Sequence, residues 1–188
     1  MGSLYEDFFT GDVTVTTNLI NAGVEATTAS FRAPAVYATK GVDGSDMDWT
    51  ITRFALLDLD GDGADELVLA IDYSGEEEYV ILTGYDGAVY ANQVVHRGFL
   101  SPKADGTFEW SNGAFDNGAS RARFENGVLV YDDFAAMSEG SDGNAVYTLN
   151  GESIDKAAYS AFLDEQAAKD DLAWTEFSVD AVNAALAG

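Results

Sequence analysis

The chain has 188 residues, 33 acidic against 9 basic side chains, a formal net charge of −24 and no cysteine. This charge makes nucleic acid and anionic membrane surfaces poor partners, because their phosphates would be repelled. Disulfides and thiolate metal sites are excluded. The length suits a single domain over residues 1–188 that can bury a hydrophobic core without disulfides.

The N-terminal quarter carries weak signals. The start Met1–Ser3 is typical of a recombinant chain, so we expect that a leader has been removed. No apolar run approaches the roughly 20 residues of a membrane span, so we expect no membrane insertion. Alternating Val and Thr over residues 12–17 indicate a strand, whereas residues 20–31 favour a weak helix or irregular structure. We therefore predict an irregular or helical segment over residues 1–48.

Residues 49–154 have the pattern of an antiparallel β-meander. Short runs of strand-forming residues are separated by two-residue turns whose chemistry favours positive φ. These turns are Asp86-Gly87, Asp105-Gly106, Asn126-Gly127 and Asn150-Gly151.

The C-terminal residues 155–188 change character and predict two helices. Asp155 and Ser178 are suitable N-caps, and each precedes a partly apolar helical run. The predicted fold class is therefore α+β: a mostly antiparallel, meandering β-sheet with terminal helices.

The most informative stretch is residues 58–66, Asp-Leu-Asp-Gly-Asp-Gly-Ala-Asp-Glu. It joins the apolar runs 51–57 and 67–71, and the second run is typical of a strand covered on both faces. Five carboxylates this close together repel one another unless a cation neutralises them.

Calcium takes roughly six to eight oxygen ligands, which a tight loop can supply from alternate positions. The sequence therefore predicts a strand–calcium loop–strand unit. Leu69 stands where an EF-hand needs a bidentate Glu, which excludes the helix–loop–helix type. Magnesium is less suitable, because it usually keeps several waters. The predicted ligands are Asp58, Asp60, Asp62, the backbone carbonyl of Ala64 and Glu66.

Residues 54–68 resemble the Asp-x-Asp-Gly-Asp-Gly-x-x-Glu-Leu loop of FG-GAP/VCBS-like calcium modules. With residues 5–9 and the Asn-Gly-x-x-Ile-x-x-x-x-Tyr pattern at 150–159, the chain is also similar to secreted proteins and lipoproteins of unknown function from Gram-positive gut bacteria. The resemblance implies the same five calcium ligands, an extracellular or cell-surface location and no known enzymatic activity. A single loop is too few for a propeller.

Other residue patterns allow competing interpretations. His96 is the sole histidine, and a triad with Ser101 or Ser111 lacks a Gly-x-Ser-x-Gly elbow. The carboxylates Asp43, Asp46 and Asp48 are a weaker candidate for a second cation site. Trp49, Trp110 and Trp174 could form a sugar-stacking platform, although aromatic residues in such sheets more often belong to the core.

We therefore expect a calcium-binding, non-enzymatic, monomeric extracellular or cell-surface domain whose metal is structural. The alternative is a module that binds a glycan, a cell-wall polymer or a protein, with the calcium loop shaping the site. Exposed aromatic residues near the loop would favour this alternative. A carboxylate-based hydrolase is a third interpretation, which requires two carboxyls of raised pKa in a cleft away from the loop.

Overall fold

The computed structural model describes residues 5, 13–20, 27–32, 36–40, 46–94 and 97–187. Its helices and strands in chain order are β1 (Val13–Ile20), β2 (Thr27–Arg32), β3 (Val36–Lys40), β4 (Asp46–Leu57), β5 (Glu66–Tyr73), β6 (Glu76–Tyr85), β7 (Ala88–Val94), β8 (Thr107–Gly113), β9 (Asp116–Glu125), β10 (Val128–Glu139), β11 (Ala145–Leu149), β12 (Glu152–Ile154), α2 (Lys156–Ala167), β13 (Thr175–Glu176) and α3 (Val179–Leu186).

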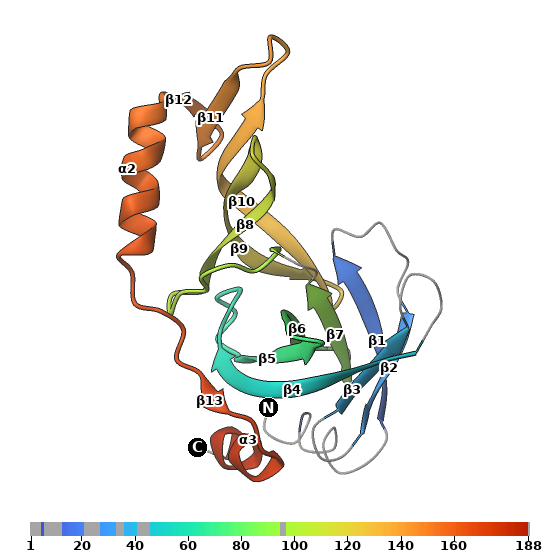
Figure 1. Cartoon of the computed structure of the whole chain (residues 1–188). Coiled ribbons are helices and arrows are strands. Elements are labelled where there is room, and N and C mark those ends of the chain that lie inside the picture. Colours follow the sequence, from blue (N-terminus) through green and yellow to red (C-terminus); the bar gives the residue numbers. More distant parts are fainter. Residues whose placement is uncertain are drawn as a thin grey trace.

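In the described part of the chain, the first seven strands form a closed barrel (Figure 1). Each strand from β1 to β7 pairs antiparallel with the next. The ring closes through a parallel β1–β7 pair, in which Thr16 lies opposite Tyr90. A meander with an odd number of strands must close in this way, because its first and last strands run in the same direction.

In the N-terminal segment, the structure confirms the strand predicted over residues 12–17 and corrects the helical or irregular expectation for the residues that follow. Every described residue between 13 and 48 lies in a strand, including β2 inside the segment that we predicted as helical or irregular. Sequence propensity is weak there, and the ladders of β2 with β1 and β3 decide the conformation by satisfying backbone hydrogen bonds. Elsewhere the mostly antiparallel α+β fold agrees with the prediction.

The strands β8–β12 form a second antiparallel sheet, in the order β12-β11-β10-β9-β8. This second sheet extends away from the barrel, and α2 runs alongside it (Figure 1). Side chains of the helix and the sheet pack together around Tyr159, Ala119 and Ala135, all of them buried.

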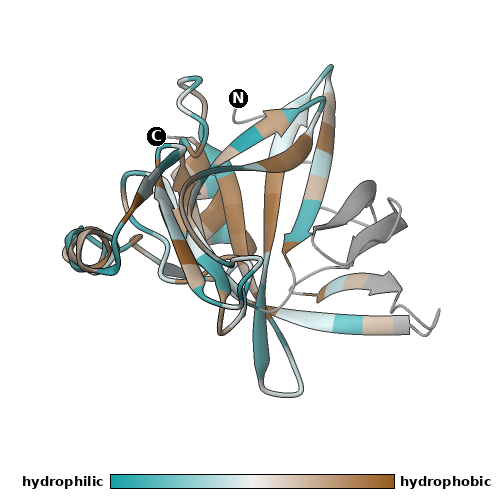
Figure 2. Ribbon diagram, turned by 90° about the horizontal axis from the view of Figure 1, so that it is seen from above, coloured by the Kyte–Doolittle hydropathy of each residue, from teal (hydrophilic) through white to brown (hydrophobic). Residues whose placement is uncertain are grey.

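Strand β5 is covered on both faces, as its unbroken apolar run predicts. Leu67 and Leu69 belong to the core inside the barrel, whereas Val68 faces the opposite way, toward the second sheet. Figure 2 shows hydrophobic residues along the strands in the middle of the molecule. The cluster between the barrel and the second sheet, here the inter-sheet core, buries Leu59, Val68, Ile81, Val94, Phe99, Phe108, Ala122 and Leu129.

Both predicted helix caps are confirmed. The Asp155 carboxylate accepts a hydrogen bond from the Ala158 N–H at 2.8 Å, and the Ser178 hydroxyl accepts one from Ala181 at 3.1 Å. These bonds satisfy N–H groups that have no partner inside the helix. Neither described helix combines the length and the hydrophobicity that crossing a bilayer would need.

Replacing Gly118 with Ala should destabilise the second sheet. A methyl group there would lie 2.2 Å from the Ala135 carbonyl oxygen and 3.0 Å from the Trp110 ring. We expect Gly118→Ala to lower the free energy of unfolding by ~1–3 kcal/mol in urea denaturation. Gly113→Ala is the matched control, since nothing lies within 4 Å of a methyl group at Gly113. Equal stability of the two variants would contradict the prediction.

Candidate metal centre

The acidic loop connects two paired strands. Strand β4 ends at Leu57, directly opposite Glu66 at the start of β5, so residues 58–65 must reverse the chain over a short distance. Gly61 and Gly63 have φ of 79° and 88°. Side chains other than Gly rarely adopt these angles, so the two glycines make the reversal possible.

Carboxylates organise the backbone of this loop. Asp58 accepts hydrogen bonds from Gly61 N at 2.8 Å and from Gly63 N at 3.0 Å. Asp60 accepts one from Asp62 N at 3.1 Å. The loop is therefore folded around its own acidic side chains, which holds them in defined positions.

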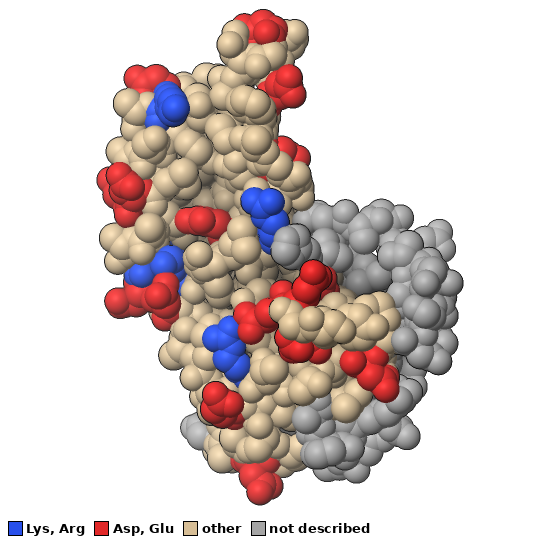
Figure 3. All heavy atoms as spheres, viewed as in Figure 1, with Lys and Arg blue, Asp and Glu red and all other residues tan. Residues whose placement is uncertain are grey.

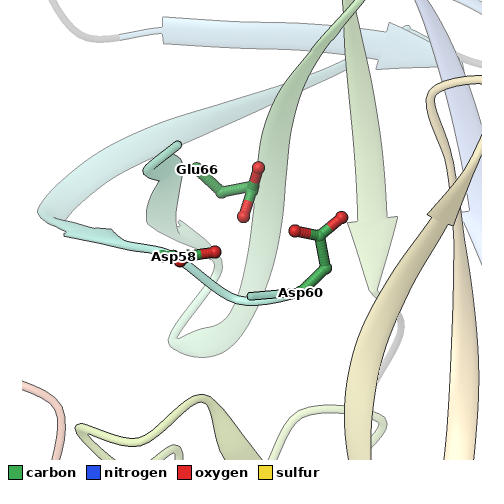
Figure 4. Close-up of side chains that lie close together, drawn as sticks. All are labelled: Asp58, Asp60 and Glu66. Atoms are coloured by element: carbon green, nitrogen blue, oxygen red, sulfur yellow. The ribbon is translucent and has the colours of Figure 1, made fainter. Parts of the chain in front are cut away.

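Three of the predicted ligands converge. One carboxylate oxygen from each of Asp58, Asp60 and Glu66 lies within 4.8 Å of the others. Figure 4 shows the side chains of Asp60 and Glu66 directed toward one another, with Asp58 beside them. Asp60 is exposed, Asp58 is half-buried and Glu66 is buried. This acidic cluster could hold a metal ion.

Of the other two predicted ligands, Asp62 lies in the same loop but is not among the three converging carboxylates. The exposed Asp62 accepts a hydrogen bond from the Ala64 N–H at 2.7 Å. Ala64 itself is buried. Asp65 is exposed and is not among the three converging carboxylates.

Glu66 is held in an environment that disfavours its charged form. Glu66 is 4% exposed, and this burial raises the pKa of its carboxyl group to about 8. The negative charges of Asp60 and Asp62 add to the shift. Hydrogen bonds from Leu59 N at 2.9 Å and from the Thr83 hydroxyl at 3.4 Å oppose the shift only in part. A cation at this point would restore the charged form.

The neighbouring groups show the same excess of negative charge. Although Asp60 is exposed, partial desolvation of its carboxyl raises its pKa, and the charges of Asp62 and Asp58 raise it further. Burial and the nearby Glu66 raise the pKa of Tyr5, whose hydroxyl donates to the Leu82 carbonyl at 3.1 Å.

On the face drawn in Figure 3, acidic side chains outnumber basic ones on the described surface. Such a field raises the local concentration of cations.

The donor set fits a hard cation. All three converging ligand atoms are carboxylate oxygens, which suit calcium, magnesium or manganese and do not select zinc or copper. Backbone carbonyls and waters usually complete such a shell.

Two aromatic side chains, the exposed Tyr85 and the half-buried Tyr90, lie near the loop, which sequence reasoning missed. Thr83 bonds to Glu66 on one side and is paired with Tyr90 on the other. The Tyr90 ring contacts Tyr85 edge-to-face, with centroids 6.1 Å apart, and Tyr85 is 43% exposed. Because β6 runs antiparallel to β5, Tyr85 lies at the end of the sheet where the loop begins. The strand register, which the sequence did not reveal, creates this neighbourhood.

The three tryptophans do not form an exposed platform. Trp49 and Trp110 are 5% and 9% exposed. Trp174 is half-buried and stacks on Tyr79, with centroids 5.7 Å apart, and the Arg53 guanidinium lies over its ring, 4.7 Å from the centroid.

The remaining candidates are separated or cannot be placed. His96, Asp43 and the side chain of Asp46 lie outside the described residues, so neither the triad nor the second cation site is tested. Asp48 is exposed on β4, Ser101 is exposed, and Ser111 accepts a hydrogen bond from Arg97 at 2.9 Å. Two described carboxyl groups with a clearly raised pKa, Asp60 and Glu66, both lie in the acidic cluster.

Comparison with protein-family models, curated proteins and solved structures found no significant match for any of the three.

The metal-free protein should lose stability as the pH rises. The folded pKa of Glu66, about 8, lies above its unfolded value, so the stabilising contribution is complete below about pH 4.5 and is lost as the pH rises through about 8. We expect the melting temperature in chelator to fall between about pH 4.5 and 8, and to fall less in Glu66→Gln, which cannot ionise. Parallel curves for the two proteins would contradict this assignment.

Proposed function

We propose that the acidic loop binds calcium and that this ion holds the connection between β4 and β5 in place. The observation that carries the proposal is the convergence of Asp58, Asp60 and Glu66 within 4.8 Å. Calcium–oxygen distances of about 2.3–2.6 Å place opposite ligands about 5 Å apart, so all three oxygens fit around one calcium ion. The resemblance to FG-GAP/VCBS-like calcium loops supports the choice of metal.

The proposed role is structural, in an extracellular or cell-surface protein. Calcium modules in extracellular proteins bind with dissociation constants of about 10⁻⁴–10⁻³ M, so they are filled only where calcium is abundant. The dense carboxylates and the resemblance to secreted Gram-positive proteins support this setting. No catalytic group is assigned.

Calcium should raise the melting temperature of the protein. Calcium at about 1 mM with such an affinity stabilises the folded state by ~0.4–1.4 kcal/mol through mass action, which corresponds to a shift of roughly 1–6 °C. Asp60→Asn should abolish the shift, because it removes a converging oxygen charge while conserving shape. Scanning fluorimetry in calcium and in chelator measures both effects.

Asp65→Asn is the matched control for this experiment. It removes the same charge from an exposed residue of the same loop that lies outside the acidic cluster. We expect its calcium response to match that of the unmodified protein. A melting temperature indifferent to calcium and chelator would refute the proposal, and an equal loss in both variants would reduce the effect to general charge screening.

A glycan-binding function is the second candidate, and the tyrosine pair beside the loop favours it. Exposed aromatic rings supply the stacking surface that sugars use, and a loop-bound calcium could accept sugar hydroxyls as further ligands. Tyr85 and Tyr90 lie on the same face of the sheet as Glu66, within two strands of it.

Tyr85→Ala should weaken glycan binding roughly tenfold if this second function holds. Tyr73→Ala is the control, since Tyr73 is similarly exposed at 41% but lies at the opposite end of β5. A glycan array probed in calcium and in chelator provides the measurement. The absence of any bound glycan, or an equal loss in both variants, would eliminate this candidate.

A further inference from the structure

We propose that cation binding by the acidic loop controls how firmly the second sheet and α2 are docked on the barrel. This inference rests on the proposed calcium site. It assigns the loop a regulatory role beyond its own conformation, because the same residues that bring the ligands together also build the contact between the two sheets.

Leu59 is the first link. It stands between Asp58 and Asp60, two residues of the acidic cluster, yet it is only 3% exposed. Its side chain belongs to the inter-sheet core together with Phe99 and Phe108. Its backbone N–H donates to the carboxylate of Glu66 at 2.9 Å. The position of Leu59 is therefore set by two neighbours in the chain that belong to the acidic cluster, and by Glu66, the third cluster residue, through a hydrogen bond.

Gly106 is the second link. It belongs to the turn that precedes β8, where Gly106 N donates to the Lys103 carbonyl at 3.0 Å. A methyl group at Gly106 would lie 3.2 Å from the Leu59 carbonyl oxygen and 3.6 Å from that of Asp58. This turn of the second sheet thus packs directly on the backbone of the acidic loop.

The same turn is fastened to the end of α2. The buried Lys103 ammonium bonds to the Ala167 carbonyl at 3.2 Å and to Asp171 at 2.6 Å. Thr107 is fully buried and accepts a hydrogen bond from Gln166 at 2.5 Å. Contacts therefore run without a break from the acidic cluster through the turn to the helix.

Removing the cation should loosen this chain of contacts. Repulsion among the uncompensated carboxylates favours loop conformations that separate them, and any such movement displaces the leucine between them from the inter-sheet core. Local opening then costs less free energy across the second sheet. Calcium selects the closed loop and so raises the cost of opening.

Hydrogen exchange measured by mass spectrometry tests this inference on the full chain. At free calcium about ten times the dissociation constant, we expect about tenfold slower exchange in residues 97–110 and 160–172 than in chelator. In Leu59→Ala, titration calorimetry should still detect calcium binding, while slower exchange should be confined to residues 58–66. Leu56→Ala is the matched control, because Leu56 packs on the core inside the barrel, and it should keep the distant protection.

The outcomes separate the two proposals. Calcium binding with protection confined to residues 58–66 in the unmodified protein overturns the coupling and leaves the calcium site intact. No calcium binding in calorimetry overturns both. The comparison of the unmodified protein with and without calcium depends on no variant, so a failure of Leu59→Ala to fold leaves the test decisive.

Discussion

The main constraint on this structure is the mutual repulsion of the carboxylates gathered between β4 and β5. The strands must be joined by a short turn, and the turn found here uses acidic side chains as hydrogen-bond acceptors for its own backbone. That solution brings Asp58, Asp60 and the buried Glu66 together. Without a counter-ion the repulsion opposes folding, and we propose that a bound cation relieves it where the loop meets the second sheet.

Local features of the fold could be predicted from the sequence, and long-range ones could not. The acidic loop, the unbroken apolar run of β5 and the caps Asp155 and Ser178 are encoded by neighbouring residues, so spacing alone indicates them. Residues of β2 and β3 are extended because they pair with neighbouring strands of the barrel. Their own composition only weakly predicts a strand. The predicted helical character of that segment was wrong for this reason.

The candidate site shows the same division. All five predicted ligands were chosen from the spacing of residues within one loop. The structure brings Asp58, Asp60 and Glu66 into one cluster, whereas the Asp62 carboxylate accepts a hydrogen bond from the Ala64 N–H. The contact of Gly106 with the loop and the tyrosines beside Thr83 arise from strand register and sheet packing. No pattern within one segment encodes such neighbours, because they are far apart in the chain.

The parallel pair that closes the barrel has a consequence for the order of folding. β1 cannot find its partner on that side until β7 has been synthesised and paired with β6, since the β1–β7 ladder joins Thr16 to Tyr90. Its loop-closure entropy is the largest among the ladders that join two barrel strands, because every other such ladder joins strands that are consecutive in the chain. The β1–β7 ladder should therefore form last among the barrel ladders. Until then, one edge of β1 in the growing chain has no strand partner.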